Sequence, residues 1–371
     1  MLRKSENQNK MLKEQILPSM CYGCGTCSGI CPNDAIVMRL DRKRGIYLPK
    51  IDEMKCNGCG ICTQVCPWHF LDKGELDIFV YGKQSNDILG NYLGCYLGYS
   101  TNVKLRTVSS SGGLVPALLT FALREGIIDG ALVTKMSRKE PSTPISFIAK
   151  TESEIISAAG SKYISVPANV GLKEILRKKG KYAVVGLPCH IQGIRKAEKV
   201  NEKLNERVVL HLGLFCSGTI SSYGTNLLLK SLNVNREKIS QIHYRSDGWP
   251  GGFKAFLKNG TQTPIIPFSD YISIIRFYLP LSCLVCWDAL NELSDISFGD
   301  AWLDSIRNSD KKGISLIISR TKKGEELIKT AENKGVIKLK RISPQEVIKA
   351  QKRNINFKKR NLWMRLSFCL L

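Results

Sequence analysis

The sequence predicts an α/β protein (α+β overall) in two parts: a small cysteine-rich unit, then a larger domain with a mostly parallel sheet. Two observations predict this division. The first 70 residues hold two runs of four cysteines, each closed by a proline. Beyond them, strand-like and helix-like segments alternate, which is typical of a parallel sheet flanked by helices.

The two cysteine runs share one spacing, Cys-x2-Cys-x2-Cys-x3-Cys-Pro, and the second run begins 35 residues after the first. Bacterial-type ferredoxins space the ligands of two 4Fe-4S clusters in this way, and the fourth cysteine of each run binds the other cluster. A pair of zinc sites or a disulfide framework are the alternatives. The predicted ligand sets are Cys21, Cys24, Cys27 and Cys66 for one cluster, and Cys56, Cys59, Cys62 and Cys31 for the other.

Length and composition leave room for a second core. A chain of 371 residues suggests two or three domains. We expect a ferredoxin-like domain over residues 1–80, an α/β ligand-binding domain over 81–310, and a basic C-terminal α/β extension of that domain over 311–371. No apolar run is long enough to span a membrane, no secretory signal is present, and fourteen cysteines point to metal rather than to disulfides. A cytoplasmic, reducing compartment is therefore expected.

The formal net charge of the polypeptide is +23 at pH 7, and Lys and Arg concentrate in residues 173–207 and 311–360. Such a surface favours an anionic cofactor or an acidic electron-transfer protein. A solvated basic face without a specific partner is the alternative. Nucleic acid is not expected, because no recognition motif accompanies the charge. The tail, residues 361–371, mixes basic and apolar residues, so it could contact a membrane surface or a partner, or pack on the chain's own core.

The larger domain is expected to alternate strands and helices after a connector at residues 82–100, which is rich in Gly and Tyr. A hairpin is expected around Asn259-Gly260. Expected strands are residues 128–133, 182–185, 208–214, 295–302 and 314–319, and expected helices are residues 114–124, 191–199, 222–232 and 324–334.

Four further cysteines stand where such a sheet builds ligand sites; they are Cys189, Cys216, Cys283 and Cys286. The first two each follow a predicted parallel strand, so they are expected at one edge of the sheet, and the other two form a Cys-x2-Cys loop. Together the four could bind a third cluster. Buried cysteines or half of a zinc site are the alternatives. We expect Cys95 and Cys369 to be plain buried or interface residues.

Small and polar residues mark further candidate ligand contacts. The segment SSSGG precedes the expected helix at residue 114, where N–H groups and hydroxyls can approach a phosphate; a serine N-cap is the alternative. His190 could donate a hydrogen bond to a cofactor. The candidates are Ser109, Ser110, Ser111, Gly112 and Gly113 in this segment, Ser161, Lys162 and Tyr163 in a later loop, and Gly299 and Asp300 at a strand end.

Residues 93–302 resemble the beta subunits of coenzyme F420-reducing hydrogenase and their relatives in dehydrogenases. The resemblance rests on RTVSSSGGLVPALLTFALREGIIDGALV, GSKY, YAVVGLPCHIQGI, LGLFCSG and CLVCWDALNELSDISFGDAW, in that order. The family binds FAD and a 4Fe-4S cluster, and several members carry a fused two-cluster unit. The resemblance therefore implies that the four scattered cysteines bind a third 4Fe-4S cluster and that the SSSGG loop holds the FAD diphosphate.

The resemblance also implies an enzyme, an iron-sulfur flavoprotein oxidoreductase. Coenzyme F420, the substrate, would exchange hydride with FAD, and the clusters would pass single electrons to a redox partner subunit or a soluble acceptor. Lys162 and His190 are the catalytic candidates, and Lys162 is expected to stabilise reduced flavin. The basic surface suits the anionic groups of the deazaflavin coenzyme. Two alternatives are a ferredoxin-driven flavin reductase of another organic substrate and a non-catalytic electron-transfer subunit.

Overall fold

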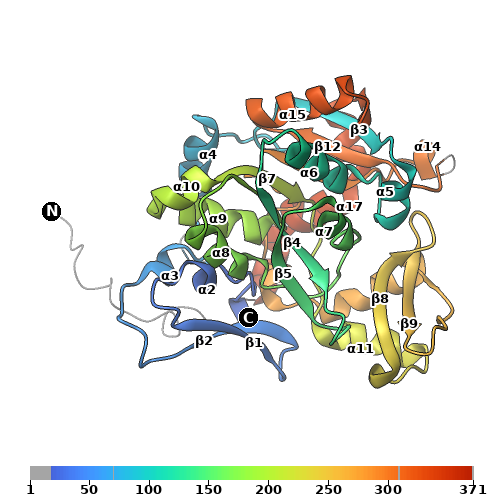
Figure 1. Ribbon diagram of the computed structural model, residues 1–371, viewed down its shortest axis with the longest axis horizontal. Coiled ribbons are helices and arrows are strands. Elements are labelled where there is room, and N and C mark those ends of the chain that lie inside the picture. The colour runs from blue at the N-terminus through green and yellow to red at the C-terminus, as the bar shows by residue number, and fades with distance from the viewer. Residues whose placement is uncertain (1–17, 70, 308–309, 370–371) are drawn as a thin grey trace.

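The computed structural model describes residues 18–69, 71–307 and 310–369, which form three sheets and their surrounding helices (Figure 1). The largest sheet has eight strands in the order β13-β3-β12-β11-β7-β6-β4-β5. Its strands are β3 (Gly94–Ser100), β4 (Gly130–Met136), β5 (Pro144–Ala149), β6 (Tyr182–Gly186), β7 (Val208–Leu214), β11 (Ile296–Asp300), β12 (Ser315–Ser319) and β13 (Ile337–Arg341).

The centre of this sheet is parallel and its margins are antiparallel. Strands β11, β7, β6 and β4 pair in parallel, whereas β5 pairs antiparallel to β4, and β12, β3 and β13 pair antiparallel in turn. Strands β3, β4, β6, β7 and β11 therefore run in one direction and the other three run in the opposite one. The predicted α/β class with a mostly parallel sheet is confirmed.

Helices cover both faces of the sheet, and strand alternation supplies a core to each face. In β4, Ala131 and Val133 pack into the core under α6 (Leu114–Arg124) and α15 (Lys322–Asn333). Leu132, between them, packs into the core under α9 (Pro188–Val200). Because successive side chains of a strand point to opposite faces, one strand serves both layers. The remaining helices against the sheet are α7 (Glu152–Ser157), α8 (Leu172–Arg177), α10 (Glu202–Arg207), α16 (Pro344–Ala350) and α17 (Lys352–Ile355).

The cysteine-rich unit is small and docks below α8 and α9 (Figure 1). Its elements are α2 (Thr26–Ile30), β1 (Ile36–Asp41), β2 (Ile46–Ile51) and α3 (Ile61–Gln64), and the two strands form an antiparallel pair. Glycines allow the close approach: a Cβ on Gly29 would lie 2.0 Å from the Asn169 carbonyl oxygen, and one on Gly193 would lie 2.2 Å from Thr26 Oγ1. The unit is therefore seated directly on the larger domain.

The expected connector at residues 82–100 is in part a strand, so that prediction was wrong. Residues 94–100 form β3, which lies between β12 and β13 inside the sheet. A Cβ on Gly98 would lie 2.7 Å from the backbone oxygen of Lys338, so glycine is what allows β13 to pack this closely. The glycines that suggested a turn serve close packing instead.

A third sheet forms from the predicted hairpin and one additional strand. Strands β8 (Ile239–Ser246), β9 (Gly252–Leu257) and β10 (Ile266–Pro267) are antiparallel, with a core shared by α11 (Ser222–Ser231) and α12 (Phe268–Ile275). Gly260 takes a φ of 84° in the turn between β9 and β10, as the Asn259-Gly260 signal predicts.

The other described elements are mostly short. In the part of the chain that the structure describes, no helix is long and apolar enough to cross a membrane. These elements are η1 (Pro18–Met20), α4 (Lys73–Tyr81), α5 (Val103–Val108), η2 (Ala168–Gly171), η3 (Arg236–Lys238), η4 (Arg276–Tyr278), α13 (Leu281–Leu284), α14 (Asp304–Arg307), the π-helical η5 (Asn356–Arg360) and α18 (Leu362–Cys369).

Candidate functional site

The first predicted cysteine set gathers at the start of α2. Gly25, the N-cap of this helix, takes a left-handed φ of 84° and turns the chain tightly between Cys24 and Cys27. Burial raises the pKa of the Cys27 thiol, and the charges of Cys24, Cys21 and Cys66 raise it further. The structure thus brings Cys66, from the second run, to the three leading cysteines of the first run.

The second set lines a cavity at the surface of the unit. Cys31, Cys56, Cys59 and Cys62 all line this cavity, together with backbone around Gly60. Cys59 is exposed, whereas Cys24 and Cys27 of the first set are buried. The second set therefore lies nearer to solvent than the first.

The cysteines are not arranged for single ions. Among the described residues, no three His, Cys, Asp or Glu side chains lie close enough to hold one metal ion, and the described cysteines are free thiols. Four thiolates around one zinc ion must converge on it at about 2.3 Å, whereas those of a 4Fe-4S cluster bind its outer corners and stand farther apart.

The four scattered cysteines also come together. Cys189 lies in the first turn of α9, Cys216 follows β7, Cys283 lies in α13 and Cys286 follows that helix. Burial raises the pKa of the Cys189 thiol, as do the charges of Cys24 and of the other three members. The predicted loop before α9 is shorter than expected, because α9 begins at Pro188, a residue suited to a first helical turn.

Two contacts join this third set to the first. The hydroxyl of Ser282 donates to the carbonyl oxygen of Cys21 at 3.1 Å. Tyr22 lies between the sets: burial raises the pKa of its hydroxyl, and the charges of Cys286, Cys189, Cys283 and Cys66 add to the shift. The three sets therefore form a series, third to first to second, that ends at the exposed Cys59.

A buried lysine that sequence reasoning missed lies against the third set. Lys358 is 1% exposed, and its Nζ donates to the Cys283 carbonyl oxygen at 2.8 Å. Burial acts to lower the pKa of Lys358, but the charges of Cys286, Cys283 and Cys216 outweigh it and raise the pKa. In the sequence Lys358 stood within a basic run, and nothing marked it as buried.

The SSSGG loop lies at the N-terminus of α6, as predicted. Gly113 is the N-cap with a φ of 73°, and a Cβ on Gly112 would lie 2.6 Å from the Gly98 carbonyl oxygen. Ser110 Oγ accepts from the N–H of Ser161 at 2.7 Å, so the two predicted loops touch. The Ser109 hydroxyl is buried and has no hydrogen-bond partner among the described residues. The loop thus offers a free hydroxyl beside the positive end of a helix.

Arg245, on β8, joins all three predicted ligand segments, and sequence reasoning missed it. Its Nη1 donates to the Tyr163 hydroxyl at 3.0 Å and to Asp300 Oδ2 at 3.1 Å, and its Nη2 donates to the Ser110 carbonyl oxygen at 3.1 Å. Its neighbourhood, SDGWPGG, is a turn-rich signal. Beside Asp300, Gly299 has no room for a side chain, because a Cβ there would lie 2.1 Å from the Phe215 ring.

Aromatic rings surround this arginine. The guanidinium of Arg245 lies 4.5 Å from the ring centroid of Phe268, which stacks on Trp302 at 5.6 Å and 11°. Trp249 lies 4.9 Å from Trp302, and its Nε1 donates to Asp300 Oδ1 at 2.9 Å. Flat apolar surfaces, a cation and a helix N-terminus meet here, and they suit a ligand with an aromatic ring system and phosphates.

The side chains of the two catalytic candidates, Lys162 and His190, form hydrogen bonds with backbone groups. Lys162 Nζ donates to the carbonyl oxygens of Ala158, Ala159 (3.2 Å) and Gly160 (2.8 Å), and burial lowers its pKa to about 7. It lies in the segment beside Ser161 and Tyr163. His190 is buried, its Nδ1 accepts from the Leu187 N–H and its Nε2 lies 3.0 Å from the Val166 carbonyl oxygen.

Neither ring nitrogen of His190 is thus left for a cofactor, in contrast to its predicted role as a donor. Burial lowers its pKa to about 4, which keeps the ring neutral. A neutral ring with one donor and one acceptor matches these two backbone partners. The side chain therefore ties the start of α9 to the segment before η2.

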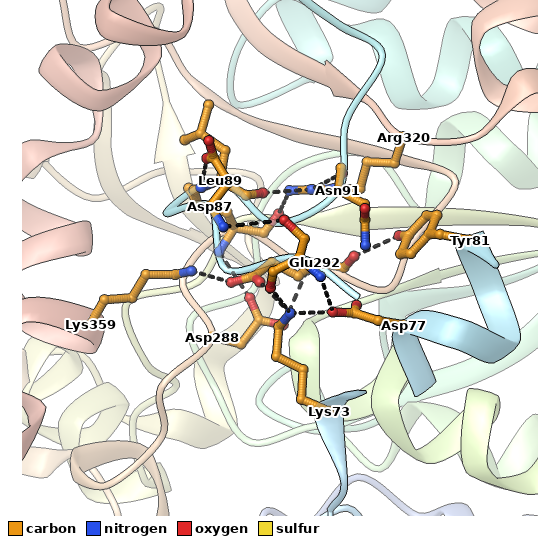
Figure 2. Close-up of polar contacts among 12 residues, drawn as sticks. Lys73, Asp77, Tyr81, Asp87, Leu89, Asn91, Asp288, Glu292, Arg320 and Lys359 are labelled. Atoms are coloured by element: carbon orange, nitrogen blue, oxygen red, sulfur yellow. Dashed lines mark hydrogen bonds and ion pairs between the residues drawn. The ribbon is translucent and has the colours of Figure 1, made fainter. Parts of the chain in front are cut away.

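A buried polar cluster centred on Glu292 follows Cys286 closely in the chain (Figure 2). Glu292 pairs with Lys359 and lies 3.5 Å from the ammonium of Lys73. Asp288, two residues after Cys286, accepts hydrogen bonds from the N–H groups of Leu290, Asn291 and Glu292. Burial and the charge of Asp288 raise the pKa of Glu292. Figure 2 shows α4, the loop after Cys286 and the C-terminal segment meeting at this carboxylate.

Three family models match successive parts of the chain. Residues 20–70 match a 4Fe-4S dicluster domain. Residues 95–173 and 179–345 match, respectively, the N-terminal and C-terminal parts of the coenzyme F420 hydrogenase/dehydrogenase beta subunit. The first model spans both cysteine runs, and the other two span the SSSGG loop, Arg245 and the third set.

Similar proteins and structures agree with these matches. The coenzyme F420 hydrogenase subunit beta of Methanothermobacter thermautotrophicus is 30% identical over 240 residues, 63% of this chain and 79% of that relative. The coenzyme F420-dependent sulfite reductase of Methanocaldococcus jannaschii is 27% identical over 337 residues, 84% of this chain and 46% of that relative. A chain of the F420-reducing [NiFe] hydrogenase complex from Methanosarcina barkeri matches with a TM-score of 0.61 and 26% identity, over 76% of this chain and 96% of that chain.

Proposed function

Because this chain belongs to the coenzyme F420 hydrogenase/dehydrogenase beta subunit family, we propose that it exchanges hydride between coenzyme F420 and a bound FAD, and passes single electrons through three 4Fe-4S clusters to a redox partner. Family membership supports an F420-linked oxidoreductase with iron-sulfur clusters. The flavin, the third cluster and the roles of individual residues are parts of the proposal.

The cysteine sets supply the cluster ligands in this proposal. The four members of each set approach one another from separate segments, and a thiolate-only donor set favours iron-sulfur clusters. The ligands would be Cys21, Cys24, Cys27 and Cys66 for the first cluster, Cys31, Cys56, Cys59 and Cys62 for the second, and Cys189, Cys216, Cys283 and Cys286 for the third.

The segments around Arg245 would hold the FAD. The unpartnered Ser109 hydroxyl and the N-terminus of α6 suit the diphosphate, and the rings of Phe268 and Trp302 suit a flat ring system. Arg245 would hold the loops of Ser110 and Tyr163 in place. Bound FAD would handle the two electrons of a hydride together on one side and single electrons on the other. The clusters would carry the single electrons.

Lys162 would need to move to act on the flavin. Its ammonium bonds three backbone carbonyls at the end of α7, so its direct effect is to hold the loop that carries Ser161 and Tyr163. With a pKa lowered to about 7, it can lose or keep its proton near neutral pH. The proposed role near the flavin therefore depends on a change of rotamer when ligand binds.

The observation that carries the proposal is the third cysteine set. Four cysteines, from α9, from the end of β7 and from the segment at α13, meet beside the first set and are joined to it by the Ser282–Cys21 hydrogen bond. A dicluster domain alone would not need them. They connect the sheet domain to a cluster series that reaches the surface at Cys59.

Cofactor content and coenzyme specificity test the proposal. Anaerobically prepared protein is expected to contain about twelve irons and one FAD per chain, and to transfer electrons from reduced F420 to a viologen dye. About eight irons without flavin would contradict it and indicate an electron-transfer subunit. Full cofactor content with no F420 reaction, but with turnover from reduced ferredoxin, would show that another substrate is used.

A further inference from the structure

Lys358 is a buried cation without a carboxylate partner. Its side chain is 1% exposed, and among the described residues no carboxylate lies within ion-pair distance of its Nζ. The Cys283 carbonyl oxygen accepts one of its three donor hydrogens at 2.8 Å, and the Phe357 ring centroid lies 5.9 Å away. Buried charges in proteins are normally paired, because an isolated ammonium costs several kcal/mol to bury.

The neighbouring lysine shows that a carboxylate is available close by. Lys359 pairs with the buried Glu292, whereas Lys358 turns toward the third cysteine set. Both residues lie in η5, a π-helical segment, which sets consecutive lysines on different partners. Arg365, from α18, donates to the Leu284 carbonyl oxygen at 2.6 Å and fixes the same loop. The C-terminal segment thus delivers one unpaired ammonium to this loop.

The anion that matches this ammonium is the cysteine set itself with its iron. Four thiolates around a 4Fe-4S core carry roughly two net negative charges when oxidised and three when reduced. The uncompensated cation therefore faces a group that would gain negative charge during electron transfer. A fixed cation at this place stabilises the reduced state more than the oxidised state.

We infer that Lys358 is the counter-ion of the third 4Fe-4S cluster and raises the reduction potential of that cluster. The inference rests on the proposed function for the existence of the cluster. A cluster held there would gain one negative charge on accepting one electron, and Lys358 would offset part of it. Lys358 is a positioning and tuning residue, since its ammonium contacts the ligand loop rather than a substrate.

Potentials measured on the full chain test this role. In anaerobic redox titrations followed by electron paramagnetic resonance, Lys358→Met is expected to lower the potential of the third cluster. At a fixed potential, the ratio of reduced to oxidised third cluster should fall at least tenfold, equivalent to about 59 mV. Lys358→Arg, which keeps the charge, should restore most of the ratio. Lys352→Met, at an exposed position in the same segment, is the matched control and should change nothing.

The remaining outcomes each support or overturn the role of Lys358. If Lys358→Met keeps about twelve irons and an unchanged potential, the inference is wrong while the proposed function stands. Loss of four irons in Lys358→Met, with retention in Lys358→Arg, supports the charge role. Loss of four irons in both variants would show that the side chain acts through its packing and not through its charge, and would overturn the inference. A wild-type protein with about eight irons overturns both the inference and the third cluster.

Discussion

The Ser282 hydroxyl donates a hydrogen bond to the Cys21 carbonyl oxygen at 3.1 Å, across 261 positions of the sequence. Ser282 is fully buried and precedes Cys283, so the contact joins two loops that carry proposed cluster ligands. The rate of electron tunnelling falls steeply with distance. A bond that fixes these two loops against each other would therefore bear on the proposed electron transfer between the first and third sets.

Ser282→Ala is expected to loosen this junction. Loss of the hydroxyl leaves the carbonyl of Cys21 without this donor in a partly buried place, which should cost about 1–3 kcal/mol of unfolding free energy. Anaerobic urea denaturation measures the loss, and rapid-mixing spectroscopy should show slower electron transfer from the flavin domain to the N-terminal clusters. Ser269→Ala, at an exposed position, is the control. Equal effects of the two substitutions would contradict the role of the junction.

Gly193→Ala is expected to push the dicluster unit off α9. Alanine in place of glycine normally stabilises a helix by about 1 kcal/mol. Here the new Cβ would lie 2.2 Å from Thr26 Oγ1, and overpacking of this kind costs about 1–3 kcal/mol. We therefore expect net destabilisation and a lower melting temperature.

A double-mutant cycle separates this clash from other effects. Thr26→Ala removes the clashing oxygen but also an acceptor for Asn169, whose Nδ2 donates to it at 2.8 Å. Thr26→Ala should destabilise the wild type, yet it should recover part of the stability of Gly193→Ala. Additive losses would show that the two helices do not meet as closely as the structure indicates.

The sequence was most informative where residues occur in spaced patterns. The dicluster unit, the hairpin at Asn259-Gly260 and the strand at residues 208–214 are found as predicted, because each depends on local spacing. β3 escaped notice, since its glycines make sense only against β13, which lies more than 200 residues away. Such packing between distant segments leaves no local signal.

Single residues of the candidate site were missed for the same reason. Arg245 belongs to no motif, and its importance arises from three loops that converge on it. Lys358 looked like one member of a solvated basic run, although it is buried. The reverse holds for His190, which stood next to a predicted ligand but serves two backbone groups. The prediction of Cys369 as a buried residue lies outside the side chains that the structure describes.

Arg245→Lys is expected to release the flavin. A lysine keeps the charge, but its single nitrogen cannot occupy the positions of both Nη1, which bonds Tyr163 and Asp300, and Nη2, which bonds the Ser110 carbonyl, so the loops lose their common partner. FAD content after desalting should fall at least tenfold, while the iron content stays at the wild-type value. Arg236→Lys, at an exposed position in η3 just before β8, should retain FAD. Retention of FAD by Arg245→Lys would place the flavin elsewhere.

Cys216→Ser and Cys95→Ser should have opposite effects on iron. Cys216 lies with the third set, whereas Cys95 is buried in β3 within an apolar core. Cys216→Ser is expected to lose up to four irons per chain, together with the electron paramagnetic resonance signal of the third cluster. Cys95→Ser should lose no iron. Iron analysis with spectral comparison checks both. Iron loss from both variants would indicate general instability rather than a ligand role.

Asp295 holds a buried charge network together. Its Oδ2 accepts from the His211 N–H at 2.7 Å, and its Oδ1 lies 3.5 Å from the guanidinium of Arg195. Glu198 pairs with the same two residues from the other side. Burial would raise the pKa of Asp295, but Arg195 and His211 reverse this and hold it well below its usual range.

Asp295→Asn is therefore expected to cost about 3–5 kcal/mol of unfolding free energy at pH 7, as removal of one partner from a buried ion pair does. The folded-state pKa lies below the unfolded value of 3.8, so the stabilisation is fully present above pH 3.8 and is lost as pH falls through the lower folded value. The difference from wild type should stay constant between about pH 5.5 and 8 and shrink only below about pH 4. Urea midpoints across this range measure the difference.

Lys323→Gln is the control. It removes a half-exposed partner of Asp295 and should cost less than about 1 kcal/mol. A penalty for Asp295→Asn that already shrinks between pH 8 and 6 would mean that Asp295 titrates there, and that Arg195 and His211 do not hold its charge.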